Sequence, residues 1–200
     1  EVGLQLEPWA TRVVSGSGNA AIQIGQPGHI VSSRGITTLE VPSLLTREEG
    51  SIHPYGNPYV WLDPLNLKRM AENIAQGLIR IDAAHRGDYE RGLASFSRRI
   101  DEALFGGELV ESVGGAKLDR LARQGRLQEF LAERDLVAGG WLALAAPLAG
   151  VQVVSYHKTW IYFCTRFGFQ VPIEIEEKPG IPPSARHRER VLEVMRERKI

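Results

Sequence analysis

The sequence has little of what several common classes of protein require. It holds one cysteine, Cys164, in 200 residues, so no intramolecular disulfide can form and a disulfide-stabilised scaffold is excluded. The 24 basic and 24 acidic side chains cancel to a formal net charge of zero, which argues against nucleic acid and against anionic membranes as partners. No apolar run approaches the roughly 20 residues of a membrane-spanning helix. A hydrophobic content of 43% is nevertheless enough to build a core.

Motifs of common catalytic and metal sites are also missing. The sequence has no G-x-S-x-G, Walker A, H-E-x-x-H or paired-cysteine zinc spacing. Residues 16–21 formally match G-x-G-x-x-A, but helix-like residues precede them and a strand-like run follows, which favours a turn over a nucleotide site. Cys164 lies within an apolar helical run, which predicts a buried and inert thiol.

Helical periodicity dominates the middle of the chain. Asp63 offers an N-cap acceptor, Pro64 suits the first helical position, and apolar residues then recur at helical spacing as far as Ile81. A second periodic run extends from Tyr89 to Leu104, with charged residues on its other faces. Glycine pairs punctuate the segment that follows, 105–141, where short helices are expected.

Extended segments are expected on both sides of these helices. Residues 20–41 indicate short strands separated by turns. In the final third, residues 151–156 favour a buried strand, a short helix closes at Gly168, and residues 169–176 alternate as a second strand. Ser184 can cap a last helix. This order of strand, helix, strand and helix predicts a parallel α/β unit.

The histidines are dispersed, at positions 29, 53, 85, 157 and 187. His157 follows a predicted strand, and ligands of parallel α/β sheets lie beyond the carboxyl ends of strands. His157 is therefore the best candidate for a metal ligand, with a hydrogen-bonded structural histidine as the alternative. His85 and His187 lie among charges on helical segments and are expected to be solvated.

Two stretches resemble the metal-specific solute-binding proteins of ABC importers, the TroA-like or ZnuA-like family. Residues 53–64, HPYGNPYVWLDP, are similar to the family signature G-N-P-H-x-W-L-D-P. Residues 153–184 are similar to the family's strand, histidine, aromatic helix and P-G-x-x-P-S loop, and residues 3–9, GLQLEPW, to a segment near the start of its first lobe. Because order and spacing are both kept, the resemblance covers nearly the whole chain.

The resemblance implies an α/β fold of two parallel-sheet lobes, joined by a long rigid helix and with a helical insert between the lobes. The expected divisions are an N-terminal lobe at 1–81, the connecting helix at 82–104, the insert and linker at 105–149, and a C-terminal lobe at 150–200. The resemblance also implies that both ends of the family fold lie outside this sequence, and with them two ligands, a histidine before Gly3 and a carboxylate after Ile200.

The resemblance places a metal ion in the cleft between the lobes. His157 matches the second-lobe ligand, and a histidine rather than a glutamate there favours zinc over manganese. Tyr59 stands where the first-lobe signature has histidine, and a phenol coordinates only after it loses its proton. His53 lies close enough in the loop to supply a donor instead. Asp63 is expected to cap its helix and not to bind metal.

The expected function is capture of zinc or manganese as a transported ligand, delivered to an ABC transporter permease without catalysis. The resemblance implies a monomer in the periplasm or another extracytoplasmic space, held at the membrane peripherally or by a lipid anchor. The alternative is a degenerate, metal-independent binding protein or adhesin in which Tyr59 has ended metal capture. A metallohydrolase would need a carboxylate base near His157.

Overall fold

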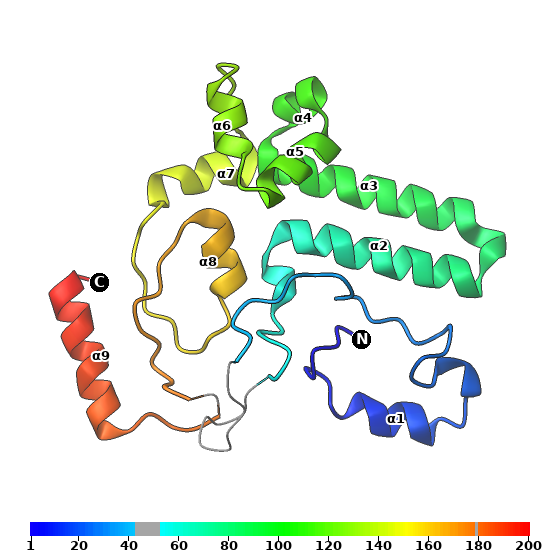
Figure 1. Ribbon diagram of the computed structural model, residues 1–200, viewed down its shortest axis with the longest axis horizontal. Helices are drawn as coiled ribbons and strands as arrows, with labels where there is room; N and C mark the ends of the chain where they lie inside the picture. The colour runs from blue at the N-terminus through cyan, green and yellow to red at the C-terminus, as the bar shows by residue number, and fades with distance from the viewer. Residues whose placement is uncertain (43–52, 179) are drawn as a thin grey trace.

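The computed structural model describes residues 1–42, 53–178 and 180–200. Its α-helices are α1 (Ala10–Gly16), α2 (Pro64–Ile81), α3 (Arg86–Phe105), α4 (Gly107–Val113), α5 (Gly115–Arg123), α6 (Leu127–Ala132), α7 (Gly140–Ala145), α8 (Ile161–Phe167) and α9 (Ala185–Arg198). Short 3-10 helices are η1 (Ala20–Ile22), η3 (Val60–Leu62), η4 (Ala83–His85) and η5 (Ala146–Leu148). Helices α2 and α3 lie side by side and antiparallel, α4 to α7 gather at one end of α3, and α9 lies at the far edge (Figure 1).

Helix α2 has the bounds that the sequence predicts. The backbone N–H of Leu65 donates to Asp63 Oδ1 at 3.0 Å, so the aspartate caps the helix, and Pro64 occupies its first turn. The apolar stripe then buries Leu65 and Met70. The helix ends at Ile81, and the cap expected of Asp63 is confirmed.

Helix α3 begins at Arg86, after η4, and not at Asp82 as expected. Asp82 has a φ of −143°, outside the helical range, and its carboxylate accepts the hydroxyl of Tyr89 at 2.7 Å. The helices expected after α3 are present as α4 to α7. Gly106 and Gly139 allow the end of α3 and the start of α7 to meet, because a Cβ on Gly106 would lie 2.7 Å from the Gly139 Cα.

The largest apolar cluster joins helices α4 to α6 to α2, α3 and α8. Its buried members are Leu65, Leu104, Phe105, Leu109, Leu118, Leu127, Phe130, Leu131 and Phe167. A second, smaller cluster lies beside the loop that precedes α2 and consists of Val60, Met70 and Tyr162. The loop is therefore held between α2 and α8 by apolar contacts.

Parallel pairing is present in the final third, but only as single bridges. Gln152 pairs with Gln170 and Ser155 with Glu174, both in the parallel sense that the sequence indicates. The described residues contain no longer ladder. The short strands expected within 20–41 are wrong: these residues form η1, turns and bends, and none of them pairs in a sheet. Asn19 accepts the backbone N–H of Ala21 at 2.9 Å and starts η1 where the first strand was expected.

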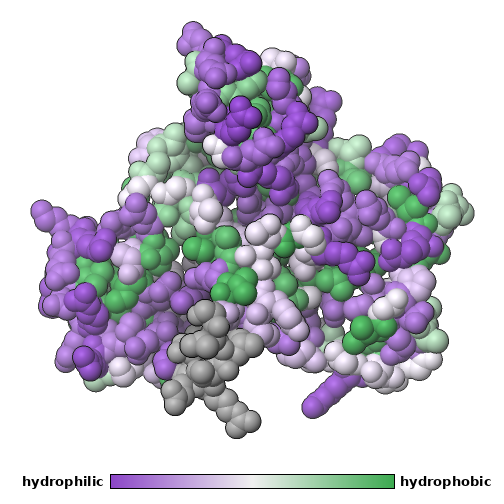
Figure 2. Space-filling view, viewed as in Figure 1, coloured by the Kyte–Doolittle hydropathy of each residue, from purple (hydrophilic) through white to green (hydrophobic). Residues whose placement is uncertain are grey.

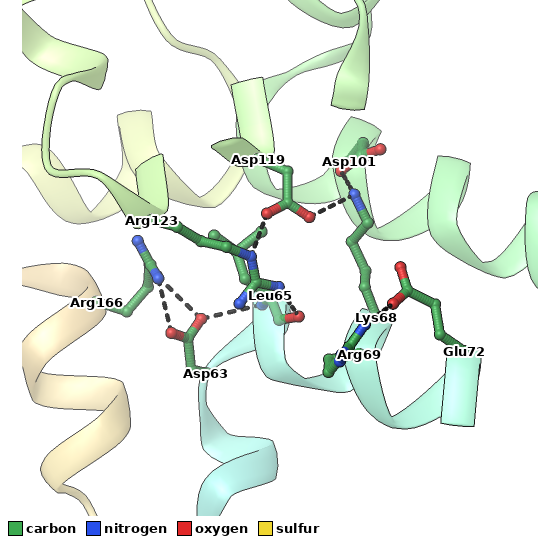
Figure 3. Close-up of polar contacts among 9 residues, drawn as sticks. All are labelled: Asp63, Leu65, Lys68, Arg69, Glu72, Asp101, Asp119, Arg123 and Arg166. Carbon is green, nitrogen blue, oxygen red and sulfur yellow. Dashed lines mark hydrogen bonds and ion pairs between the residues drawn. The ribbon is translucent and has the colours of Figure 1, made fainter. Parts of the chain in front are cut away.

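A buried ionic network connects α2, α3 and α5. Lys68 Nζ lies 2.6 Å from Asp101 Oδ1 and 2.9 Å from Asp119 Oδ2, and Asp119 also pairs with Arg123 (Figure 3). The Lys68 and Asp101 side chains are both less than 10% exposed. Because a buried charge is costly without its partner, this network fixes how the three helices dock.

The surface is unevenly divided between polar and apolar side chains. Hydrophilic residues cover the helices α4 to α6, whereas hydrophobic residues reach the surface in patches across the middle of the molecule (Figure 2). None of the helices within the described ranges combines the length and hydropathy needed to cross a lipid bilayer.

Candidate functional site

The loop of residues 53–63 is organised around Asn57. This side chain is 7% exposed and donates from Nδ2 to Glu40 Oε2 at 2.8 Å and to the carbonyl oxygen of Lys158. Its Oδ1 accepts the backbone N–H of Tyr59 at 3.0 Å, which turns the chain into η3. Asn57 thus joins the loop before α2 to the segment before α8.

Helix α8 holds the same loop through Tyr162. The Tyr162 hydroxyl donates to the carbonyl oxygen of Asn57 at 2.8 Å and accepts the backbone N–H of Leu39 at 3.0 Å. Burial raises the pKa of Tyr162, so the phenol stays neutral and can donate. Gly56, which has a φ of +96°, lies close to the Leu39 backbone. A Cβ at position 56 would lie 2.7 Å from the Leu39 carbonyl oxygen.

An ion pair from α8 also reaches the start of α2. Arg166 donates from Nε to Asp63 Oδ1 at 2.9 Å and from a terminal nitrogen to Oδ2 at 2.7 Å (Figure 3). The two side chains are 17% and 13% exposed. Asp63 therefore caps α2 and binds Arg166 with the same carboxylate, a bidentate geometry that fixes position as well as charge.

His157 lies just after the bridge between Ser155 and Glu174. Its carbonyl oxygen accepts the Ser155 hydroxyl at 2.8 Å and the backbone N–H of Thr159 at 2.7 Å. Its ring Nδ1 pairs with Glu176 Oε2, and the two side chains are 28% and 11% exposed. Hydrogen bonds from Ser155 and Thr159 thus fix the backbone of His157, and Glu176 fixes its ring.

The ring of His157 meets the loop of residues 53–63 at Tyr59. The two ring centroids are 6.0 Å apart with planes at 90°, an edge-to-face arrangement. Tyr59 also packs edge-to-face on Trp61, with centroids 5.4 Å apart. Tyr59 therefore packs on Trp61 and meets His157 with the same ring.

His53 belongs to the same neighbourhood. Burial lowers its pKa, and the charge of a protonated His157 lowers it further. Both effects favour the neutral imidazole, the form that binds metal ions. The structure therefore brings His157, Tyr59 and His53 to one region formed by two distant parts of the chain.

The described ranges do not contain a complete metal site. No three His, Cys, Asp or Glu side chains among these residues gather closely enough to hold a metal ion. Zinc takes four donors in a closed tetrahedral site, so His157, Tyr59 and His53 would make up only part of the ligand set.

The other histidines and the cysteine lie apart from this region. His85 is exposed as expected and contacts the Asp82 carboxylate at 2.8 Å. The expectation that His187 is solvated is wrong: its side chain is 14% exposed, because Nε2 bonds the Glu174 carbonyl oxygen at 2.8 Å. Cys164 is buried as expected, and burial raises the pKa of its thiol.

Sequence reasoning missed Glu176, Tyr162 and Arg166 as partners of the site residues. The signal for Glu176 was present, because His157 and Glu176 close two successive predicted strands, and parallel strands bring such ends together. No comparable signal identified Tyr162 or Arg166, since an aromatic or basic residue on a short helix has many possible partners.

Segments 53–63 and 155–176, far apart in the chain, thus meet at the His157 ring. Solved structures share this fold. The protein in the crystal structure of ZnuA is 26% identical in sequence to this chain. The match covers 98% of this chain and 56% of that chain, with a TM-score of 0.60. FpvC from Pseudomonas aeruginosa in complex with Mn2+ is 16% identical, with coverage of 100% and 58% and a TM-score of 0.62, so it supports the fold alone.

The family follows from the sequence itself. The model of the ZnuA family, described as zinc-uptake complex component A, periplasmic, matches residues 1–104, and the chain belongs to this family. AdcAII of Streptococcus pneumoniae shares the fold at 20% identity, with 85% of this chain and 48% of that chain covered and a TM-score of 0.52. No curated protein matches the chain. The chain spans less than two thirds of the length of these solved relatives.

Proposed function

We propose that this protein captures a zinc ion in the region between His157 and Tyr59 and delivers it to an ABC permease, with manganese as the alternative ion. The observation that carries the proposal is the meeting of the His157 ring with the signature loop at Tyr59, 6.0 Å between centroids, in a chain of the ZnuA family. The ZnuA deletion mutant, solved with zinc bound, is 26% identical to this chain.

The proposal assigns a role to each candidate residue. His157 donates a ring nitrogen, His53 supplies a neutral imidazole, and Tyr59 either coordinates as a phenolate or yields its place to His53. Further donors come from parts of the family fold that this sequence does not span. A site closed by protein donors leaves no position for an activated water, so the protein acts as a carrier and not as an enzyme.

The family also suggests how the chain is organised and where it works. We assign residues 1–81 to an N-terminal lobe, 82–104 to a connecting segment in which helix α3 begins at Arg86, 105–149 to the insert and linker, and 150–200 to a C-terminal lobe, with the parallel sheets of an α/β fold in both lobes. The proposed location is the periplasm or another extracytoplasmic space, with a lipid anchor or peripheral contact near the permease. A metal-independent adhesin is not favoured, because the matching family is one of zinc uptake.

Calorimetric zinc titration of the wild type, His157→Ala and His85→Ala tests the proposal. His85 is an exposed histidine on another element, so its variant controls for loose surface binding of zinc. We expect His157→Ala to weaken binding more than about tenfold, because losing a ligand costs at least as much as losing a partner of a ligand. His85→Ala should bind as the wild type does, and equal affinity of His157→Ala and the wild type would refute the proposal. A parallel manganese titration decides between the two ions.

A further inference from the structure

We infer that Glu176 is the positioning residue of His157, and that its carboxylate leaves the ring Nε2 free as the metal donor. The inference rests on the proposed role of His157 as a ligand. Glu176 Oε2 contacts Nδ1 of the ring. In the neutral imidazole Nδ1 therefore carries the proton and donates a hydrogen bond to the carboxylate. Nε2 then has an unshared electron pair, which is what a zinc ligand needs.

The Glu176 carboxylate is itself held in place. Its second oxygen, Oε1, accepts the backbone N–H of Gly180 at 3.0 Å. The backbone N–H of Glu176 donates to the Tyr156 carbonyl oxygen at 2.8 Å, and Ile175 donates to Ser155 at the same distance. The side chain is only 11% exposed. The carboxylate is therefore fixed before any ion arrives, which lowers the cost of orienting the imidazole.

Both Glu176 carboxylate oxygens accept a hydrogen bond, one from His157 and one from Gly180. An amide at position 176 has only one such oxygen. Gly180 offers a backbone N–H, which can only donate, whereas a neutral imidazole can donate or accept at Nδ1. A glutamine would turn its single oxygen toward Gly180 and its NH2 group toward His157. The ring would then carry its proton on Nε2, which blocks the nitrogen assigned to the ion. The amide thus preserves every hydrogen bond and reverses the tautomer.

The neighbouring Glu177 provides a matched control. It is the next residue in the same segment, its side chain is 54% exposed, and its carboxylate lies 3.9 Å from Nδ1 of His187. Glu177→Gln therefore makes the same change of charge and shape close by, without touching His157.

The test combines two measurements on the wild type, Glu176→Gln, Glu177→Gln and His157→Ala. Nitrogen-15 NMR of the metal-free protein, with the ring neutral, reports which nitrogen of His157 holds the proton, and calorimetry gives the zinc affinity. We expect the proton on Nδ1 in the wild type and in Glu177→Gln, and on Nε2 in Glu176→Gln. Zinc affinity should fall about 10–100-fold in Glu176→Gln and stay unchanged in Glu177→Gln.

Several results would overturn the inference. A proton on Nε2 in the wild type does so without any variant, and hence even if Glu176→Gln fails to fold. An unchanged tautomer in Glu176→Gln also overturns it; if zinc affinity is lost at the same time, Glu176 contacts the ion directly. Should His157→Ala keep full zinc affinity, the proposed function fails at His157, and the proton position still decides whether Glu176 orients the ring.

Discussion

At the scale of single residues, Tyr59 lies at the centre of the proposed metal-binding region. Its ring fills the space between Trp61 and His157 at centroid distances of 5.4 and 6.0 Å. A phenol of ordinary pKa near 10 coordinates a metal only after it loses a proton, whereas an imidazole is neutral and ready near pH 7. The signature that residues 53–64 resemble has histidine at this position, so we propose that Tyr59 replaces a metal donor with aromatic packing.

Tyr59→His should therefore tighten zinc binding, by about tenfold or more, because a donor is gained that need not be deprotonated. Tyr55→His is the matched control, since Tyr55 lies in the same loop with its side chain 59% exposed. Calorimetric titration measures both. Unchanged affinity in Tyr59→His would mean either that Tyr59 is not at the site or that His53 already supplies this donor, and the double variant with His53→Ala separates these two explanations.

Cys164 should resist thiol reagents in the folded protein. Burial raises its pKa and so keeps it as the unreactive thiol, and the residue is 5% exposed, which shields the sulfur from reagents. Native protein should react with a disulfide reagent more slowly than the urea-unfolded chain, by more than about an order of magnitude. Equal rates in the two states would show that the α8 environment opens readily.

At the scale of elements, Asp63 joins two helices that are distant in sequence. It caps α2 through the backbone N–H of Leu65 and receives Arg166 from α8. Tyr162 and Asn57 add hydrogen bonds between α8 and the loop before α2. The position of His157 relative to Tyr59 therefore depends on contacts made along the whole length of α8.

Two substitutions separate the roles of Asp63. Asp63→Asn keeps a good capping side chain but loses the charge that faces Arg166, and should lower the free energy of unfolding by about 1.5–3 kcal/mol. Asp63→Ala also removes the cap and should cost about 0.5–2 kcal/mol more. Urea unfolding of the metal-free variants measures both.

The exposed pair of Asp88 with Arg91 offers a control for the Asp63 variants, because Asp88→Asn should change stability by less than about 1 kcal/mol. Loss of zinc binding in Asp63→Asn at unchanged stability would instead identify Asp63 as a ligand.

At the scale of the whole molecule, Lys68 connects α5 to helices α2 and α3. Its ammonium group on α2 meets Asp101 on α3 and Asp119 on α5 (Figure 3). Burial raises the pKa of Asp101 despite the lysine beside it, which shows how costly this carboxylate is to bury. The ion pairs therefore set the position of α5 against α2 and α3, which apolar contacts alone would define less sharply.

Lys68→Met should destabilise the protein by about 3–5 kcal/mol, because two buried carboxylates lose their shared counter-ion. Arg69→Met is the control from the neighbouring position, where Arg69 pairs with Glu72 on the surface, and should cost less than about 1 kcal/mol. Thermal or urea unfolding compares the two. Similar losses would mean that Lys68 contributes through its aliphatic stem alone.

Local chemistry is enough to predict several elements of the fold. The Asp63 cap, the proline after it and the apolar spacing through Ile81 define α2, since each acts within a few residues of chain. Gly168 ends α8 with a φ of +80°, and Ser184 caps α9 by accepting the backbone N–H of His187 at 3.1 Å. Motif spacing likewise indicates the family and points to His157, Tyr59 and His53.

Tertiary structure alone decided which distant groups meet. Arg166 and Asp63 are 103 residues apart, and Tyr162 and Asn57 are 105 apart, so no periodicity or motif connects them. The limited pairing of 151–156 with 169–176, and the burial of His187 against Glu174, also depend on how segments pack. A hydrogen bond requires both partners at short range and in the right direction, and the fold sets that geometry where the partners are far apart in the chain. The sequence therefore determined the residue types available for the proposed metal capture, and only the packing of α8 and the segment after it set the Glu176 carboxylate against Nδ1 of His157.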